Sequence, residues 1–435
     1  MEENKKILGS VSIPEEIVEG ITHDVKTIKD FQEVIQVYVT QNTTDLLDVI
    51  LFGAIHLEAS DIHFEPQDES IRLRVRLDGN LQDVTLFDKD IYHHLLSRIK
   101  LESKIKLNII DKPQDGRFSI AMQKDVIEIR TSTLPAEYGE TVVMRILNPK
   151  SLKALEVLGL RKDLYDIFVE EIKKPNGMIV VTGPTGAGKT TTLYAFLMKI
   201  QNPEVKIITI EDPIEYHIKG ISQTQVSQEK GYTFSEGLRS IVRQDPDVIL
   251  VGEIRDLETA KIALQASLTG HLVLSTLHTN DAAGTIPRLI DLGAEAASVA
   301  PALKMVIAQR LVREVCPKCS TLVTPNKDDL AEIEKGLKNL PKTVKSPKVA
   351  KIAKVSEKGC EACNLTGYKG RIGLYEVFLV DSQMEKFILT NPPVSEIKDL
   401  AIKKGMVTIY QSGLLEVING RTTLKEVKKV VEADE

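Results

Sequence analysis

The chain has 435 residues, 42 % of them hydrophobic, which is enough for the cores of several globular domains. Its 56 lysines and arginines are outnumbered by 62 aspartates and glutamates, so direct binding to nucleic acid is not expected. No apolar run is long enough to span a membrane, and residues 1–10 lack the apolar core of a signal peptide. We therefore expect a cytoplasmic protein that contacts a membrane only through partners.

The first 150 residues have the pattern of a small α+β domain. Residues 1 to about 25 show little periodicity and are predicted to be a flexible lead-in. Apolar side chains then recur at helical spacing over 25–39 and 46–55, the second stretch behind a predicted helix cap at Thr43–Asp45. The other elements predicted here are a hairpin over 71–84, a helix near 90–105 and strands at 117–131 and 141–147.

The hairpin has three arginines on one face of its first strand. Arg72, Arg74 and Arg76 alternate with apolar residues, and the turn falls at Asp78-Gly79. A solvated strand face and an anion-binding surface are equally good interpretations of these arginines.

From about residue 151 helices alternate with fully apolar strands, which predicts a doubly wound α/β sheet. The strands that we expect are 179–182, 206–210, 248–251 and 271–275. Each is followed by polar residues, and open α/β sheets bind ligands outside the carboxyl ends of their strands. This edge is therefore the predicted functional site.

The first of these strands is followed by Gly183-Pro184-Thr185-Gly186-Ala187-Gly188-Lys189-Thr190, which matches the phosphate-binding pattern G-x-x-x-x-G-K-[ST]. Glycines allow successive backbone N–H groups to point at an anion, and the next helix adds the positive end of its dipole. Lys189 is predicted to reach the β- and γ-phosphates and Thr190 to ligate Mg²⁺. We expect the nucleotide to contact residues 183–190 and Thr191.

Carboxylates follow the second and third strands. Glu253 fits the metal role, since Mg²⁺ prefers oxygen ligands. For the residue that activates water, Glu211 is the first choice and Glu215 the second. A helix cap or a salt bridge is the alternative for each carboxylate taken alone.

Two histidines flank the fourth strand, His271 at its beginning and His278 just after it. We expect both near the same sheet edge. A role in sensing the γ-phosphate and a purely structural role are equally good interpretations.

The four cysteines form two C-x-x-C pairs, Cys316/Cys319 and Cys360/Cys363. They predict a closed, tetrahedral and therefore structural Zn²⁺ site, although the 40 residues between the pairs exceed the usual spacing. Four unrelated cysteines are the alternative. Between the pairs we expect a helix over 328–340 and a lysine-rich stretch over 342–358. This stretch is either a solvated loop or a contact with an anionic membrane surface or an acidic partner loop. Short amphipathic helices are predicted over 384–432.

Four of these segments, in order, resemble the Walker A, Asp box, Walker B and His box of the secretion ATPase superfamily. They are Gly183–Thr190, Glu211–Glu215, Arg243–Asp256 and Thr269–Asn280. Within that superfamily the chain resembles type II secretion ATPases and type IV pilus assembly ATPases. The similarity extends through 59–66, 113–117 and 130–140, and so covers about residue 45 to the C-terminus.

The resemblance implies an α/β fold with a RecA-like P-loop motor domain behind a small α+β, PAS-like N-terminal domain. The implied segments are a lead-in with a short helix (1–43), the N-terminal domain (44–149), the ATPase domain (150–312), the four-cysteine zinc module (313–375) and a helical C-terminal subdomain (376–435). Only about 40 residues precede the first family motif, where many relatives carry additional N-terminal domains.

The resemblance also implies a ring-shaped homo-hexamer that hydrolyses ATP with Mg²⁺ and carries Zn²⁺. ATP is expected between the N-terminal and motor domains, with Arg117 and Arg130 reaching its phosphates and Arg145 a weaker candidate. The implied partner is a polytopic inner-membrane platform protein, with pilin or pseudopilin machinery contacted only indirectly. The expected location is the inner face of the cytoplasmic membrane, as a peripheral protein.

The cysteine module marks assembly and secretion ATPases of this superfamily and is generally missing from pilus retraction ATPases, which favours assembly. A retraction or DNA-transfer ATPase remains the first alternative. A nucleotide-binding regulatory scaffold without turnover is the second.

Overall fold

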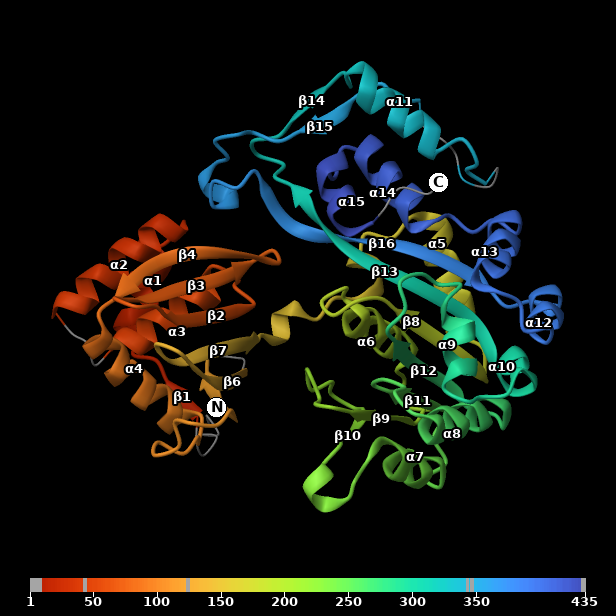
Figure 1. Ribbon diagram of the computed structural model, residues 1–435, viewed down its shortest axis with the longest axis horizontal. Helices are drawn as coiled ribbons and strands as arrows, with labels where there is room; N and C mark the ends of the chain where they lie inside the picture. Colours follow the sequence, from red (N-terminus) through yellow and green to blue (C-terminus); the bar gives the residue numbers. More distant parts are fainter. Residues whose placement is uncertain (1–9, 42–44, 123–125, 342–343, 345–347, 432–435) are drawn as a thin grey trace. The chain divides into compact units, whose positions relative to one another are not determined.

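The computed structural model describes residues 10–41, 45–122, 126–341, 344 and 348–431. The chain divides into two compact units (Figure 1). The first comprises residues 1–151 with 316–319 and 356–369, and the second comprises the remainder. Within the described residues, no helix is both long and apolar enough to cross a membrane.

The first unit contains a mixed sheet with helices packed on one face. Its strand order is β1-β5-β6-β7-β2-β3-β4, with β1 parallel to β5 and the other neighbours antiparallel. The strands are β1 (Ser10–Ser12), β2 (Asp61–Pro66), β3 (Ile71–Leu77), β4 (Asn80–Phe87), β5 (Gln114–Ala121), β6 (Val126–Ala136) and β7 (Gly139–Leu147). The helices are α1 (Glu15–Asp24), α2 (Ile28–Gln41), α3 (Leu46–His56) and α4 (Lys89–Glu102).

Alternation decides which face of this sheet is buried. In β3 the residues at positions 71, 73, 75 and 77 are buried in the core shared with the helices, which leaves the three arginines of the strand on the other face. The predicted hairpin and its turn at Asp78-Gly79 are therefore confirmed.

The start of the chain differs from the sequence-based expectation. Residues 10–24 are not a flexible lead-in, because β1 pairs with β5 and α1 buries Ile17 and Ile21 in the core. A three-residue strand that pairs with a distant segment leaves no periodicity to detect. The stretch 117–131 likewise belongs to two strands, β5 and β6. Of the predicted cap at 43–45, Thr43 and Thr44 lie outside the described residues.

The second unit is built on a sheet with helices on both faces (Figure 1). Its order is β10-β9-β11-β12-β8-β13-β16, parallel from β10 through β13. The strands are β8 (Gly177–Thr182), β9 (Ile207–Glu211), β10 (Ser222–Gln225), β11 (Val248–Val251), β12 (Leu272–Leu277), β13 (Leu303–Val315) and β16 (Tyr368–Leu379). The helices that cover it are α5 (Lys162–Glu171), α6 (Lys189–Ile200), α7 (Phe234–Val242), α8 (Leu257–Leu268), α9 (Thr285–Asp291) and α10 (Ala296–Ala302).

Strand β8 contributes to two cores. Met178 and Val180 pack with the core of α7 and α8, whereas Ile179 and Val181 pack with the core of α5 and α6. A strand covered on both faces has no polar face, which explains the continuous apolar pattern that predicted it. The predicted doubly wound α/β fold is confirmed.

The fourth strand begins one residue later and ends two residues later than expected. It ends at Leu277 rather than Ser275, and His271 precedes its first residue. Strands β10, β13 and β16 were not predicted; β16 runs antiparallel to β13, since backbone N–H groups of Val380 and Cys316 donate to the carbonyls of Lys304 and Gly367.

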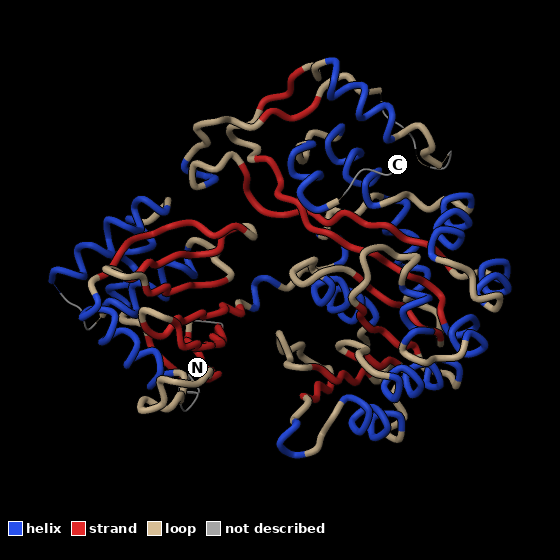
Figure 2. Tube along the Cα trace, in the orientation of Figure 1, coloured by secondary structure: helices blue, strands red, loops and turns tan. Residues whose placement is uncertain are grey.

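The remaining elements connect and follow β13 and β16, as the tube drawing shows (Figure 2). They are β14 (Thr321–Val323), α11 (Lys327–Gly336), β15 (Ile352–Lys354), α12 (Ser382–Ile388), α13 (Val394–Lys403), α14 (Ile409–Ile418) and α15 (Leu424–Val430). The predicted C-terminal helices are confirmed, but they do not form a separate compact unit, because α12 and α13 share a core with the central sheet.

The lysine-rich stretch is only partly described. Lys342 and Lys345 lie outside the described residues, whereas Lys348, Lys351 and Lys358 are exposed. The second half is not a plain loop, since Lys354 belongs to β15.

Candidate nucleotide site and cysteine cluster

The glycine-rich loop joins β8 to α6 in the second unit. Gly183, Gly186 and Gly188 have φ angles of 147°, 80° and 85°, which side chains other than glycine rarely allow. At Gly183 an added Cβ would lie 2.5 Å from the carbonyl oxygen of Gln309. The loop therefore has the curled backbone that the motif predicted, and it requires glycine for this reason.

Lys189 begins α6 and extends back over the loop. Its Nζ donates to the carbonyl oxygens of Gly183 at 2.8 Å and Pro184 at 3.1 Å. Burial lowers the pKa of Lys189 to about 8, while the negative charge of Glu253 acts in the opposite direction. Thr190 and Thr191 follow in the first turn of the helix.

Glu253 and His278 come together at the carboxyl ends of two adjacent strands. Glu253 follows β11 and His278 follows β12, and Oε2 of Glu253 lies 3.4 Å from Nε2 of His278. Glu253 also pairs with Arg255 at 2.5 Å. Because β8, β12 and β11 are parallel neighbours, the residues that follow their carboxyl ends, Lys189, His278 and Glu253, lie at one edge of the sheet.

Glu211 is engaged differently. Its carboxylate is 3 % exposed and accepts hydrogen bonds from Tyr194, from Thr209 at 2.6 Å and from Gln223 at 3.2 Å. Burial raises its pKa, and the charge of Glu215 contributes in the same direction. Among the described residues, no hydrogen bond or ion pair joins Glu211 to the cluster at Lys189.

His271 lies at the opposite end of β12 from His278. The two residues are seven positions apart along the strand, about 23 Å at the usual rise, so the expectation that both lie near one sheet edge is wrong. The ring of His271 donates from Nδ1 to the carbonyl oxygen of Ala266 at 2.9 Å. Its observed role is to tie the end of α8 to the start of β12.

Sequence reasoning missed Gln309 and Arg310 of β13. The strand pairs with β8 as far as Ala308 and Thr182, so its next residues run beside the glycine-rich loop. Oε1 of Gln309 accepts from the Thr192 hydroxyl at 2.7 Å, and Arg310 donates to the carbonyl oxygen of Asn280 at 2.6 Å. The signal was present, because an apolar run that ends in polar residues also marks the strands that were predicted.

Burial lowers the pKa of Arg310, and its positive charge helps to lower that of Lys189. Two cations thus lie close together at the glycine-rich loop, an arrangement that favours a polyanionic ligand.

In the first unit, charged residues form one row across the sheet. The strand registers place Arg117, Arg130, Arg145, Asp61 and Arg76 directly opposite one another on successive strands. Direct partners share a face of the sheet, and this is the face away from the helices.

The arginines of this row differ in their partners. Asp61 pairs with Arg145 at 3.2 Å and Arg76 at 3.3 Å, and Arg130 pairs with Glu128 at 3.3 Å. Arg117 is exposed and has no ion pair among the described residues. Arg117 could therefore bind an anion without first breaking an ion pair.

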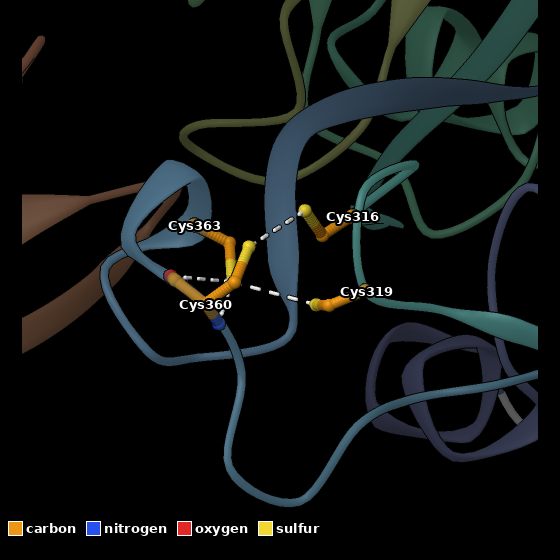
Figure 3. A group of neighbouring side chains, drawn as sticks. All are labelled: Cys316, Cys319, Cys360 and Cys363. Atoms are coloured by element: carbon orange, nitrogen blue, oxygen red, sulfur yellow. Dashed lines mark hydrogen bonds between the residues drawn. The ribbon is translucent and has the colours of Figure 1, made fainter.

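The four cysteines converge from the loops that follow β13 and precede β16 (Figure 3). Their sulfur atoms all lie within 4.8 Å of one another, and the pairs Cys316/Cys360, Cys319/Cys363 and Cys360/Cys363 are 3.8 Å apart. These distances exceed an S–S bond of about 2.05 Å. They match the edge of a tetrahedron with Zn–S bonds of about 2.3 Å, which is about 3.8 Å.

The environment of Cys363 favours a thiolate. Burial alone would raise its pKa, but N–H groups of Cys360 and Gly367 donate to its sulfur at 3.2 Å, and the net result is a pKa of about 7. The pKa of Cys319 is raised to about 12 by burial and by the neighbouring thiols. Four thiolates this close together would repel one another without a cation, and the four-sulfur donor set fits Zn²⁺.

A model of the type II/IV secretion system protein family matches residues 40–429. The chain belongs to this family. It is 43 % identical over 373 residues to the type IV pilus assembly ATPase PilB of Thermus thermophilus, a match that covers 85 % of this chain and 41 % of that protein. It is 42 % identical over 390 residues to the type II secretion system protein E of Aeromonas hydrophila, covering 89 % of this chain and 75 % of that one.

Two solved ATPase structures have a similar fold. The pilus retraction motor PilT with bound ADP is 28 % identical, with a TM-score of 0.59 and a match that covers 88 % of this chain and 96 % of PilT. The ATPase DotB of Legionella pneumophila has a TM-score of 0.66 at 21 % identity, covering 90 % of this chain and 96 % of DotB, and supports the fold alone. The predicted membership of the secretion ATPase superfamily is therefore confirmed.

Proposed function

We propose that the chain is an ATPase motor that powers assembly of a type IV pilus or a type II secretion pseudopilus. The observation that carries the proposal is the convergence of Lys189, Glu253 and His278 at the carboxyl edge of the parallel sheet, beside a glycine-rich loop that has the backbone of a phosphate site. The names of the relatives that are about 40 % identical support assembly and secretion. The pilus retraction motor PilT is only 28 % identical to this chain, so its similarity is weaker support for a retraction function.

In the proposed reaction the loop holds the ATP phosphates and Lys189 neutralises part of their charge. Mg²⁺ would be held by Thr190 and Glu253 and would stabilise charge on the transferred phosphoryl group. Glu211 is the first candidate for the base that activates water, and Glu215 is the second. The raised pKa of Glu211 supports this order, since a carboxylate with a raised pKa is the better base near neutral pH. His278 would sense the γ-phosphate through Glu253.

We further propose that Arg117 and Arg130 of the first unit complete the site within a homo-hexamer, with Arg145 in a secondary role. Guanidinium groups are suited to the charge that develops on a phosphoryl group. The position of these arginines in one row supports a common ligand.

The four cysteines are proposed to hold a structural Zn²⁺. All four ligands would come from the protein, so the ion would have no open position for chemistry. The proposed partner is a polytopic inner-membrane platform protein, which would place this motor peripherally at the cytoplasmic face of the inner membrane. Contact between the exposed lysines of the 342–358 stretch and anionic lipid is a separate proposal, which vesicle binding would test.

Phosphate release from purified, size-fractionated protein tests the proposed activity. We expect turnover in the wild type, loss of nucleotide binding in Lys189→Ala, and loss of turnover with retained binding in Glu253→Gln. Glu258→Gln is the matched control, because Glu258 is an exposed residue of α8 paired with Arg239 and should leave turnover unchanged. A hexameric wild type that binds ATP without releasing phosphate would instead identify a regulatory scaffold.

Deletion of the gene separates assembly from retraction. Loss of surface pili or of secretion supports an assembly motor. Pili that remain present but immobile would contradict it.

A further inference from the structure

The loop Thr279–Gly284, which directly follows His278, is held from several sides. The Thr182 hydroxyl, at the end of β8, accepts from the backbone N–H of Thr279 at 2.8 Å. Arg310 donates to the carbonyl oxygen of Asn280 at 2.6 Å. The loop is thus fixed to both strands that flank the phosphate site.

A further contact comes from Glu376, a residue of β16 that the proposed reaction does not use. Its side chain is 1 % exposed, and Oε1 accepts from the backbone N–H of Ala282 at 2.9 Å. Oε2 accepts from the backbone N–H of Ile409 at 3.1 Å. One carboxylate therefore connects the loop that follows His278 to the first residue of α14.

The surroundings of the Glu376 side chain act on its pKa in opposite directions. Burial raises the pKa of Glu376, while the two N–H donors act in the opposite direction. The positive end of the α14 helix dipole and the charge of Lys398 also lower this pKa, whereas Asp281 of the loop raises it. Each N–H donates to a different oxygen of the Glu376 side chain, so a side chain with one acceptor oxygen would satisfy only one of the two donors.

We propose that Glu376 is a positioning residue that couples the loop after His278 to the C-terminal helices, so that nucleotide at the site changes the start of α14. Only the expected effect on kcat rests on the proposed ATPase function. The physical route consists of His278, the loop, the Glu376 carboxylate and the Ile409 N–H, with a hydrogen bond at each step after the loop.

Glu376→Gln tests this coupling, because glutamine keeps the size of the side chain but offers one acceptor oxygen instead of two. In the wild type we expect bound nucleotide to slow amide hydrogen exchange in residues 279–284 and at the start of α14. In the variant the first effect should remain and the second should disappear. We also expect kcat to fall about tenfold with little change in KM, since nucleotide contacts are kept while the position of His278 is loosened.

Glu416→Gln is the matched control. Glu416 is a buried carboxylate of α14 itself, paired with Arg421 at 3.4 Å, with no described contact to residues 279–284. It should preserve the exchange response of α14 and keep kcat within about twofold. An equal effect of both substitutions would overturn the proposal, because it would show that any lost buried charge has this result.

Ile409→Pro tests the same link if Glu376→Gln does not fold. Proline is well tolerated at the first position of a helix, and the preceding Thr408 has φ −66° and ψ 159°, as a residue before proline requires. The substitution removes the N–H that donates to Glu376 and leaves the carboxylate in place. Retention of the nucleotide response in α14 would overturn the proposal.

The two readouts separate this inference from the proposed function. A chain that binds ATP but never releases phosphate contradicts the proposed function, and the exchange experiment with bound nucleotide still decides the coupling.

Discussion

Lys189 illustrates how burial alters the chemistry of a single motif residue. Its pKa is lowered to about 8 by burial, whereas a phosphate ligand favours the protonated ammonium group. Below about pH 8 the side chain is already charged before nucleotide binds. Above that pH, binding must take up a proton.

We therefore expect affinity for Mg²⁺–ATP to fall as pH rises from 8 to 9.5, by at most about tenfold per pH unit. Calorimetry in two buffers with different ionisation enthalpies measures the proton uptake directly. In Lys189→Arg the guanidinium stays protonated, so residual binding should show no such uptake. Equal uptake by the wild type at pH 7 and pH 9 would contradict the lowered pKa.

Among the arginines predicted to reach the phosphates, the structure favours Arg117. It shares a row with other arginines, but it has no ion pair among the described residues. We expect Arg117→Ala to lower kcat by roughly 10³-fold and to leave nucleotide binding largely intact, because the contact forms with charge that develops during the reaction.

Arg72→Ala is the control for this substitution. It removes the same charge from the same face of the sheet, in β3 opposite Glu65. Turnover by Arg72→Ala should stay within about twofold of the wild type. Unchanged turnover in Arg117→Ala would remove this arginine from the site.

At the scale of elements, the cysteine cluster connects two loops that are 44 residues apart in sequence. The second loop contains one 3-10 turn, Glu361–Cys363, and the backbone N–H of Cys316 donates to the carbonyl oxygen of Gly367. A metal held by all four cysteines would add a direct link between the two loops, so we expect it to contribute to stability. We expect about one Zn²⁺ per chain by elemental analysis.

Cys363→Ser should abolish zinc binding and lower Tm by about 10 °C, since loss of a structural metal costs about 4 kcal/mol or more. Thr321→Ala, an exposed substitution in the neighbouring β14, is the control and should keep both zinc and Tm. A zinc-free wild type with unchanged Tm after chelation would show that the cluster needs no metal.

At the scale of the whole molecule, the residues proposed for one reaction belong to two compact units, Lys189 to the second and Arg117 to the first. If assembly into a ring completes the site, activity depends on oligomer size. We expect specific phosphate release to fall on dilution below the range in which the oligomer persists, in parallel with the loss of the large species measured by light scattering. Constant specific activity from a monomeric chain would contradict the proposed hexamer.

The sequence by itself determined the phosphate loop, the apolar strands of the central sheet, the two cysteine pairs and the family. These features are local: a glycine spacing, an apolar run or a C-x-x-C pair is complete within a few residues. The arginine-bearing strand β3 could also be predicted, because its apolar and charged residues alternate with a period of two.

Tertiary structure decided what depends on strand order and on contacts between distant segments. It separated His271 from His278, since each end of a strand faces a different edge of the sheet. It placed Gln309 and Arg310 beside the loop through the pairing of β13 with β8, and it turned Glu376 into a link between a loop and a helix. It also paired β1 with β5 across about 100 residues, a contact that no local pattern encodes.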